Sequence, residues 1–150
     1  MLSPDYRDIL SVFIDERVDY LVVGAYAVAS HGLPRATGDL DLWVRRDAEN
    51  ARRVWRALAK FGAPLSELTE SELSSPGLVF QIGVEPARID ILTSIDGIEF
   101  EKAWTDRVEL DVDGLRIHVI GRAHLIANKK AVGRPQDLAD VARLENLSRK

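Results

Sequence analysis

The 150-residue chain carries 24 acidic and 20 basic side chains, which give it a formal net charge of −4 at pH 7. With 46% hydrophobic and 29% charged residues, its composition is typical of folded globular proteins and excludes the disordered and fibrous classes. The acidic balance argues against a general nucleic-acid coat protein, which needs a basic surface, and the absence of cysteine excludes disulfides, thiolate zinc sites and cysteine nucleophiles.

The length and the amino terminus indicate one domain that is not exported. The chain has the size of an ordinary single domain, so we expect residues 1–150 to form one core. Pro4 and Asp5 stand where a signal peptide needs a basic start followed by an apolar run. No stretch approaches the roughly 18 consecutive apolar residues of a membrane span. We therefore expect a cytoplasmic protein without membrane association.

Hydrophobic periodicity and turn residues predict an alternation of helices and strands. The helices are expected at residues 4 to about 16, 25–30, 47–61, 100–104 (a single turn), 123–132 and 135–147. The strands are expected at residues 20–23, 39–44, 78–82, 88–92, 108–112 and 115–120. Residues 63–77 are mixed, with Ser66 and Thr69 as candidate caps of a short helix.

Short connections pair these strands into a sheet. Residues 83–86 join two strands in the manner of an antiparallel hairpin, and Asp113-Gly114 is a strong hairpin signal between two others. We therefore expect an α/β (α+β) fold in which a mixed, mostly antiparallel sheet is flanked by helices.

Three aspartates are the candidate catalytic residues. Because side chains alternate along a strand, Asp39 and Asp41 share one face while Leu40 and Leu42 share the other. Asp90 stands between two isoleucines on a second expected strand, so its carboxylate should point away from the core. The three carboxylates could therefore converge.

Convergence of carboxylates needs a cation. Two like charges about 4 Å apart repel by roughly 4 kcal/mol at an effective dielectric near 20. A pair of magnesium ions offsets this repulsion, prefers hard oxygen ligands and clamps the attacking and leaving oxygens of a phosphoryl displacement. In the structural alternative, the first two aspartates form ion pairs with Arg35 or Arg45, and Asp90 pairs with Arg88.

The residues around the aspartates carry a family resemblance. The segment from Gly24 to Leu42 follows an apolar strand and runs through His31-Gly32, Arg35 and Thr37 to the D-x-D pair. It resembles the nucleotidyltransferase superfamily that includes DNA polymerase beta, in which a G-[GS] turn precedes a D-x-D strand and a third acidic residue follows. The resemblance is closest to small bacterial nucleotidyltransferases of toxin–antitoxin and abortive-infection systems, whose K-x-A-x-x-R-x-x-D-x-x-D ending resembles residues 129–140.

The resemblance implies an activity. Asp39, Asp41 and Asp90 would hold two Mg²⁺ ions, with Mn²⁺ as a substitute, and Asp90 would be a metal ligand or the base near the nucleophile. A nucleoside triphosphate would give its nucleoside monophosphate to an acceptor hydroxyl on a tRNA end, a protein or a small molecule, with a toxin or antitoxin as partner. The alternative is a catalytically silent nucleotide- or protein-binding module, such as an antitoxin.

Five residues are expected to bind the nucleotide. The backbone N–H groups at Gly24 and Ala25 would meet phosphate oxygens at a helix start, although the family often has serine or glycine where this chain has Ala25. Arg35 and Thr37 would meet a phosphate, and Lys129 would neutralise the triphosphate. In the structural alternatives, Gly24 is a simple turn glycine and Arg35 forms a local ion pair. Thr37 is then a turn hydroxyl, and Lys129 is a cation that favours the end of its helix.

Overall fold

The computed structural model of the protein describes residues 2–33 and 37–147. In chain order the elements are α1 (Pro4–Asp15), β1 (Tyr20–Val23), α2 (Gly24–Ser30), β2 (Asp39–Val44), α3 (Ala48–Phe61), α4 (Glu70–Leu73), β3 (Val79–Ile82), β4 (Arg88–Leu92), α5 (Phe100–Thr105), β5 (Val108–Val112), β6 (Leu115–Val119), α6 (Arg122–Val132) and α7 (Pro135–Leu147). Every element expected from the sequence is present, with ends that differ by about one residue.

The six strands form one mixed sheet in the order β3-β4-β2-β1-β6-β5. The sequential pairs β1–β2, β3–β4 and β5–β6 are antiparallel, whereas β2–β4 and β1–β6 are parallel. The α/β arrangement predicted from the sequence is confirmed. The parallel pairing of β2 with β4 places the two aspartate-bearing strands side by side at the centre of the sheet.

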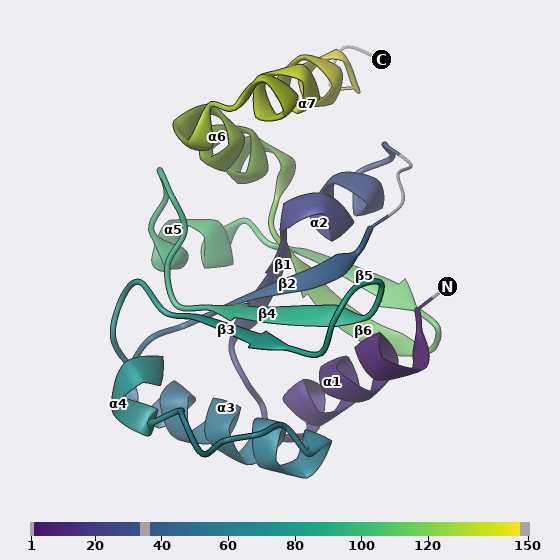
Figure 1. The fold of residues 1–150 in the computed structure, drawn as a ribbon. Helices are drawn as coiled ribbons and strands as arrows, with labels where there is room; N and C mark the ends of the chain where they lie inside the picture. The colour runs from purple at the N-terminus through teal and green to yellow at the C-terminus, as the bar shows by residue number, and fades with distance from the viewer. Residues whose placement is uncertain (1, 34–36, 148–150) are drawn as a thin grey trace.

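Helices lie on both faces of this sheet. Helices α1, α3 and α4 cover one face, and α2, α6 and α7 lie over the other, with α5 beside them (Figure 1). Leu40 and Leu42 of β2 and Ile91 of β4 are completely buried, which follows from their alternation with the polar residues of the same strands. The apolar side chains of β2 and β4 thus form a core layer, and the aspartates take the opposite face.

Local capping explains where the helices begin and end. The hydroxyl of Ser3 accepts a hydrogen bond from the Tyr6 amide, and α3 ends at Gly62, whose φ of 91° suits glycine. The mixed segment contains the short helix α4, because Thr69 and Glu72 form a reciprocal capping box. Among the helices of residues 2–33 and 37–147, none combines the length and apolarity needed to cross a membrane.

Candidate active site

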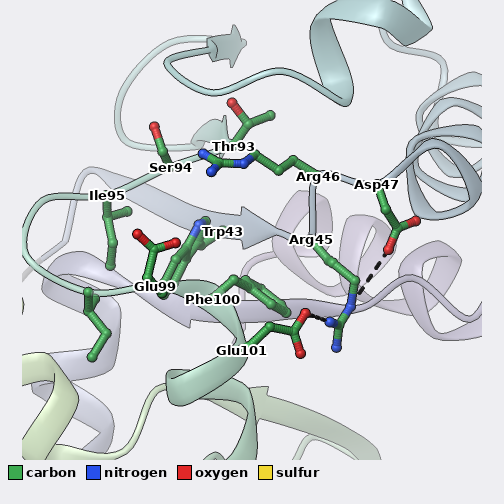
Figure 2. A pocket seen from close by; sticks show the side chains of 11 residues that line it. Trp43, Arg45, Arg46, Asp47, Thr93, Ser94, Ile95, Glu99, Phe100 and Glu101 are labelled. Atoms are coloured by element: carbon green, nitrogen blue, oxygen red, sulfur yellow. Dashed lines mark ion pairs between the residues drawn. The ribbon is translucent and has the colours of Figure 1, made fainter.

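A pocket of about 270 Å³ lies beyond the carboxyl ends of β2 and β4 (Figure 2). Trp43 and Phe100 meet edge to face in its wall, with ring centroids 5.0 Å apart, and Glu99 stands at its border. Within the described part of the chain, the buried indole N–H of Trp43 has no hydrogen-bond partner. The pocket contains none of the three predicted aspartates, which lie earlier on the same strands.

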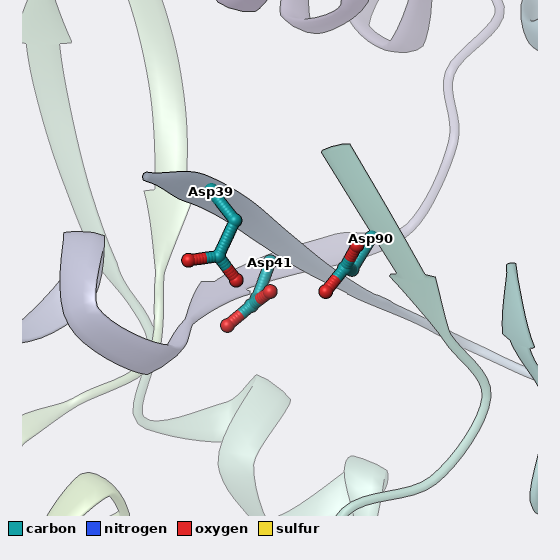
Figure 3. Close-up of side chains that lie close together, drawn as sticks. All are labelled: Asp39, Asp41 and Asp90. Atoms are coloured by element: carbon teal, nitrogen blue, oxygen red, sulfur yellow. The ribbon is translucent and has the colours of Figure 1, made fainter. Parts of the chain in front are cut away.

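Asp39, Asp41 and Asp90, hereafter the triad, come together on one face of the sheet (Figure 3). The parallel register of β2 and β4 sets Asp41 directly opposite Asp90, and Asp39 precedes Asp41 by one strand period. One carboxylate oxygen from each residue lies within 4.8 Å of the others. The structure therefore produces the convergence that the strand alternation predicts.

Burial makes this cluster electrostatically costly. Asp90 is only 6% exposed. Burial, followed by the neighbouring Asp39 and Asp90 carboxylates, raises the pKa of Asp41 to about 8. Three carboxyl groups at short range supply the hard oxygen donors that a divalent cation such as Mg²⁺ or Mn²⁺ prefers, and the cation would offset the repulsion between their ionised forms. The donor set therefore matches the metal that the resemblance implies.

Arg88 lies inside the same cluster. Its Nε is 3.1 Å from Asp90 Oδ1, and its Nη2 is 3.3 Å from Asp39 Oδ2. The ion pair between Asp90 and Arg88, which was the structural alternative for Asp90, is thus present together with the convergence of the three carboxylates. Arg45, in contrast, pairs with Asp19 at 3.0 Å and with Glu101, and does not serve the triad. Sequence reasoning treated Arg88 only as an ion-pair partner, although its register opposite Asp39 places it in the site.

Gly24 brings the backbone of α2 against the triad. Its φ is 69°, and a Cβ added at this position would lie 2.1 Å from Oδ2 of Asp41. Val23, just before it, pairs with Asp41 across β1 and β2. Ala25 follows in the first turn of α2. Glycine is required here for backbone conformation and for space.

The other predicted nucleotide-binding residues have different surroundings. Arg35 lies outside the described residues. Thr37 lines a hollow of about 510 Å³ between α2 and β5, whose lining includes Tyr26 and Asp111 but no residue of the triad. The contact of Thr37 with a phosphate therefore stays a prediction.

Lys129 is buried between the two C-terminal helices. Its Nζ lies 3.0 Å from Asp140 Oδ2 and 3.4 Å from Asp137 Oδ1. Asp137 also accepts hydrogen bonds from Arg134, and this guanidinium is the largest cause of the lowered pKa of Asp137. In the structure the C-terminal motif is an ion-pair network that joins α6 to α7.

Substitution of Lys129 separates a structural role from nucleotide binding. Lys129→Ala should lower the free energy of unfolding by about 3 kcal/mol, because the variant leaves two buried carboxylates without their shared ammonium group. For a chain of this size that corresponds to a melting temperature lower by about 6 to 12 °C, measurable by circular dichroism. Lys130→Ala is the control: that side chain is exposed and its pair with Glu145 spans 3.9 Å, so the loss should stay below about 0.5 kcal/mol. A Lys129 variant with unchanged stability and weakened nucleotide binding would support the sequence interpretation instead.

Tyr6 is a neighbour of the triad that sequence reasoning missed. Its hydroxyl donates to the Pro86 carbonyl at 3.1 Å. Burial, then the charges of Asp39 and Asp41, raises the pKa of Tyr6 to about 12. No local pattern marks this residue, because it reaches the site from α1, more than 30 positions before the D-x-D strand.

Comparison with known proteins identifies the family. The model of a family described as nucleotidyl transferase of unknown function (DUF2204) matches residues 3–150. The chain belongs to this family. It is therefore a member of the nucleotidyltransferase superfamily. A search of curated proteins finds no match to this chain.

Solved structures with the same fold include nucleotidyltransferases. A proposed nucleotidyltransferase (TM1012) from Thermotoga maritima is similar with a TM-score of 0.61 at 17% identity, over 99% of this chain and 94% of that one. The lincosamide antibiotic adenylyltransferase LnuA, bound to lincomycin, has a TM-score of 0.60 at 17% identity, over 97% of each chain. ANT(2″)-Ia in complex with adenylyl-2″-tobramycin has a TM-score of 0.60 at 15% identity, over 97% of this chain and 87% of that one. These likenesses establish the nucleotidyltransferase fold.

Proposed function

We propose that the protein is a metal-dependent nucleotidyltransferase that moves a nucleoside monophosphate from a nucleoside triphosphate to an acceptor hydroxyl. The observation that carries this proposal is the triad, whose three oxygens lie within 4.8 Å of one another on neighbouring strands of the sheet. Membership of a nucleotidyl transferase family supports the same reaction class. Two divalent ions held by these carboxylates would stabilise charge on the attacking and leaving oxygens.

In this reaction the acceptor oxygen forms a bond to the α-phosphorus of the nucleotide. The bond from that phosphorus to the bridging oxygen breaks, and pyrophosphate leaves with its electron pair. Asp90 would take the hydroxyl proton or orient the nucleophile, while Asp39 and Asp41 would hold the metal ions. The start of α2 at Gly24 and Ala25 would present backbone N–H groups to the phosphates beside Asp41.

The remaining predicted nucleotide contacts stay part of the proposal. Arg35 and Thr37 precede β2 in the chain and would reach a phosphate from there. Lys129 would act on the triphosphate only after leaving its pairs with Asp137 and Asp140, so we expect its main effect to be on stability. The expected cytoplasmic location and the role in a toxin–antitoxin system stay predictions.

A small molecule is the acceptor that the comparisons favour. LnuA was solved with lincomycin and ANT(2″)-Ia with an adenylylated tobramycin, and both share this fold. The pocket beside Trp43 offers a place for part of such an acceptor, because Trp43, which lines it, stands one strand period after Asp41 on the same sheet face. A tRNA end and a protein hydroxyl are the other acceptors to test.

A transfer assay tests the reaction. The protein is incubated with each α-³²P-labelled nucleoside triphosphate, Mg²⁺ or Mn²⁺, and a cell extract divided into small molecules, RNA and protein. Label should enter one fraction together with stoichiometric pyrophosphate, whereas the label of γ-labelled nucleotide should leave in pyrophosphate and enter no acceptor fraction. Release of inorganic phosphate alone would indicate hydrolysis. Binding of nucleotide without transfer in any fraction would favour the silent binding module.

Nucleotide with metal should stabilise the fold. A ligand at 100 times its dissociation constant that binds only the native state contributes about 2.7 kcal/mol. For a chain of this size that raises the melting temperature by roughly 5 to 11 °C, which differential scanning fluorimetry resolves. The same nucleotide with EDTA should give a much smaller shift. Equal shifts with and without metal would contradict metal-dependent nucleotide binding.

A further inference from the structure

The guanidinium of Arg88 uses oxygens that a metal ion would need. Its Nη2 lies 3.3 Å from Asp90 Oδ2 and 3.3 Å from Asp39 Oδ2, and its Nε lies 3.1 Å from Asp90 Oδ1. Both oxygens of Asp90 and one oxygen of Asp39 therefore accept hydrogen bonds from this one side chain. Among the described residues, Arg88 makes no ion pair with Asp41, so the third carboxylate stays outside its reach.

We propose that Arg88 is a positioning residue that acts as an exchangeable counter-ion: it holds Asp39 and Asp90 while the metal is absent and withdraws when the metal enters. The proposal rests on the proposed function of the triad. A single positive charge cannot balance three carboxylates, so a divalent cation is still favoured at the site. The guanidinium of Arg88, however, repels an approaching divalent cation and must first leave the oxygens of Asp39 and Asp90.

A second partner for Arg88 lies outside the triad. Its Nη1 is 3.8 Å from Glu85 Oε1. The Glu85 side chain is 66% exposed, and it passes Gly38 so closely that a Cβ there would lie 2.8 Å from Glu85 Cδ. Glu85 is thus beside the first triad residue without belonging to the cluster. An Arg88 side chain released by the metal would keep an ion pair by turning toward Glu85.

The exchange predicts that removal of the arginine charge strengthens metal binding. Binding of Mn²⁺ without nucleotide is measured by isothermal titration calorimetry and by the electron paramagnetic resonance signal of free Mn²⁺. Arg88→Gln should lower the Mn²⁺ dissociation constant by about tenfold or more, because a unit charge within ion-pair distance of the ligands no longer opposes the cation. Arg88→Lys keeps the charge without the two-pronged geometry, so its dissociation constant should stay within about threefold of the parent.

A variant of the second partner provides an independent measurement. Glu85→Gln removes the carboxylate that receives Arg88, so the Mn²⁺ dissociation constant should rise several-fold. Because Glu85 is exposed, this variant tests the proposal even where Arg88→Gln does not fold. Melting curves in EDTA check the fold of each variant. In the double variant Arg88→Gln/Asp41→Asn, the gain in affinity should disappear, which assigns the strengthened binding to the triad.

Two results would overturn the exchange. One is a folded Arg88→Gln protein whose Mn²⁺ affinity is equal to or weaker than that of the parent, which would make Arg88 a permanent organiser of the ligands. The other is a Glu85→Gln protein with unchanged or tighter Mn²⁺ binding. Neither measurement requires turnover. A protein that shows the exchange but transfers no nucleotide would contradict the proposed function alone.

Discussion

Asp41→Asn should lower the rate of nucleotide transfer by at least about a thousandfold. Asparagine keeps the volume and hydrogen bonding of the side chain but removes the charge that two metal ions require. A metal ligand commonly contributes several kcal/mol to transition-state stabilisation, and each 1.4 kcal/mol is about tenfold in rate. The measurement is transfer of α-labelled nucleotide at saturating Mg²⁺, so that weaker metal binding and slower chemistry can be separated.

The same variant should melt no lower than the parent in EDTA. The raised pKa of Asp41, about 8, means that the folded state holds a proton which the unfolded state releases near the ordinary carboxyl value. This group therefore costs stability progressively as pH rises from that ordinary value to about 8. Asparagine has no such cost, so the gain in melting temperature of Asp41→Asn should be larger at pH 8 than at pH 5.

Asp111→Asn is the matched control for this substitution. Asp111 is also a strand aspartate, but it is exposed, pairs with Arg116 at 3.2 Å and lies on the edge strand β5. Its replacement should leave transfer unchanged and shift the melting temperature little at either pH. If Asp41→Asn destabilises the metal-free protein and transfer survives, Asp41 is a structural partner and the metal assignment is wrong.

Gly24→Ala should reduce transfer by about a hundredfold while the protein still folds. The added methyl group would stand 2.1 Å from Asp41 Oδ2, so either the carboxylate or the start of α2 must move. A displacement of about 1 Å at a reacting centre can cost a factor of roughly 100 in rate. The variant should also lose about 1 to 2 kcal/mol of stability, because alanine is strained at a φ of 69°.

Gly62→Ala is the control that separates backbone strain at positive φ from the steric clash with Asp41. Gly62 has a φ of 91°, yet a Cβ there would meet nothing within 4 Å. This control should lose about 1 kcal/mol of stability through the left-handed backbone and keep full transfer activity. The transfer rate and the melting temperature of Gly24→Ala and Gly62→Ala are measured side by side. Equal activity losses in the two proteins would show that the contact of Gly24 with Asp41 has no catalytic consequence.

Local patterns in the sequence specified the secondary structure and the phase of the acidic strand. Alternation in β2 assigns Asp39 and Asp41 to one face, and the structure buries Leu40 and Leu42 on the other. Turn and cap signals, such as the reciprocal cap at Thr69, act within about four residues and are readable without tertiary contacts. The family resemblance also came from contiguous motifs, and the match over residues 3–150 confirms it.

Only the tertiary structure decided which distant groups complete the site. The register of β4 against β2 places Arg88 beside Asp39, 49 positions away, and makes one arginine serve two carboxylates. The packing of α6 on α7 turns Lys129 toward Asp137 and Asp140. These contacts depend on how strands align and helices dock across long sequence separations, which no spacing rule of period 2 or 3.6 encodes. The sequence could therefore indicate three carboxylates and an ion pair between Asp90 and Arg88, but not that the same arginine also holds Asp39.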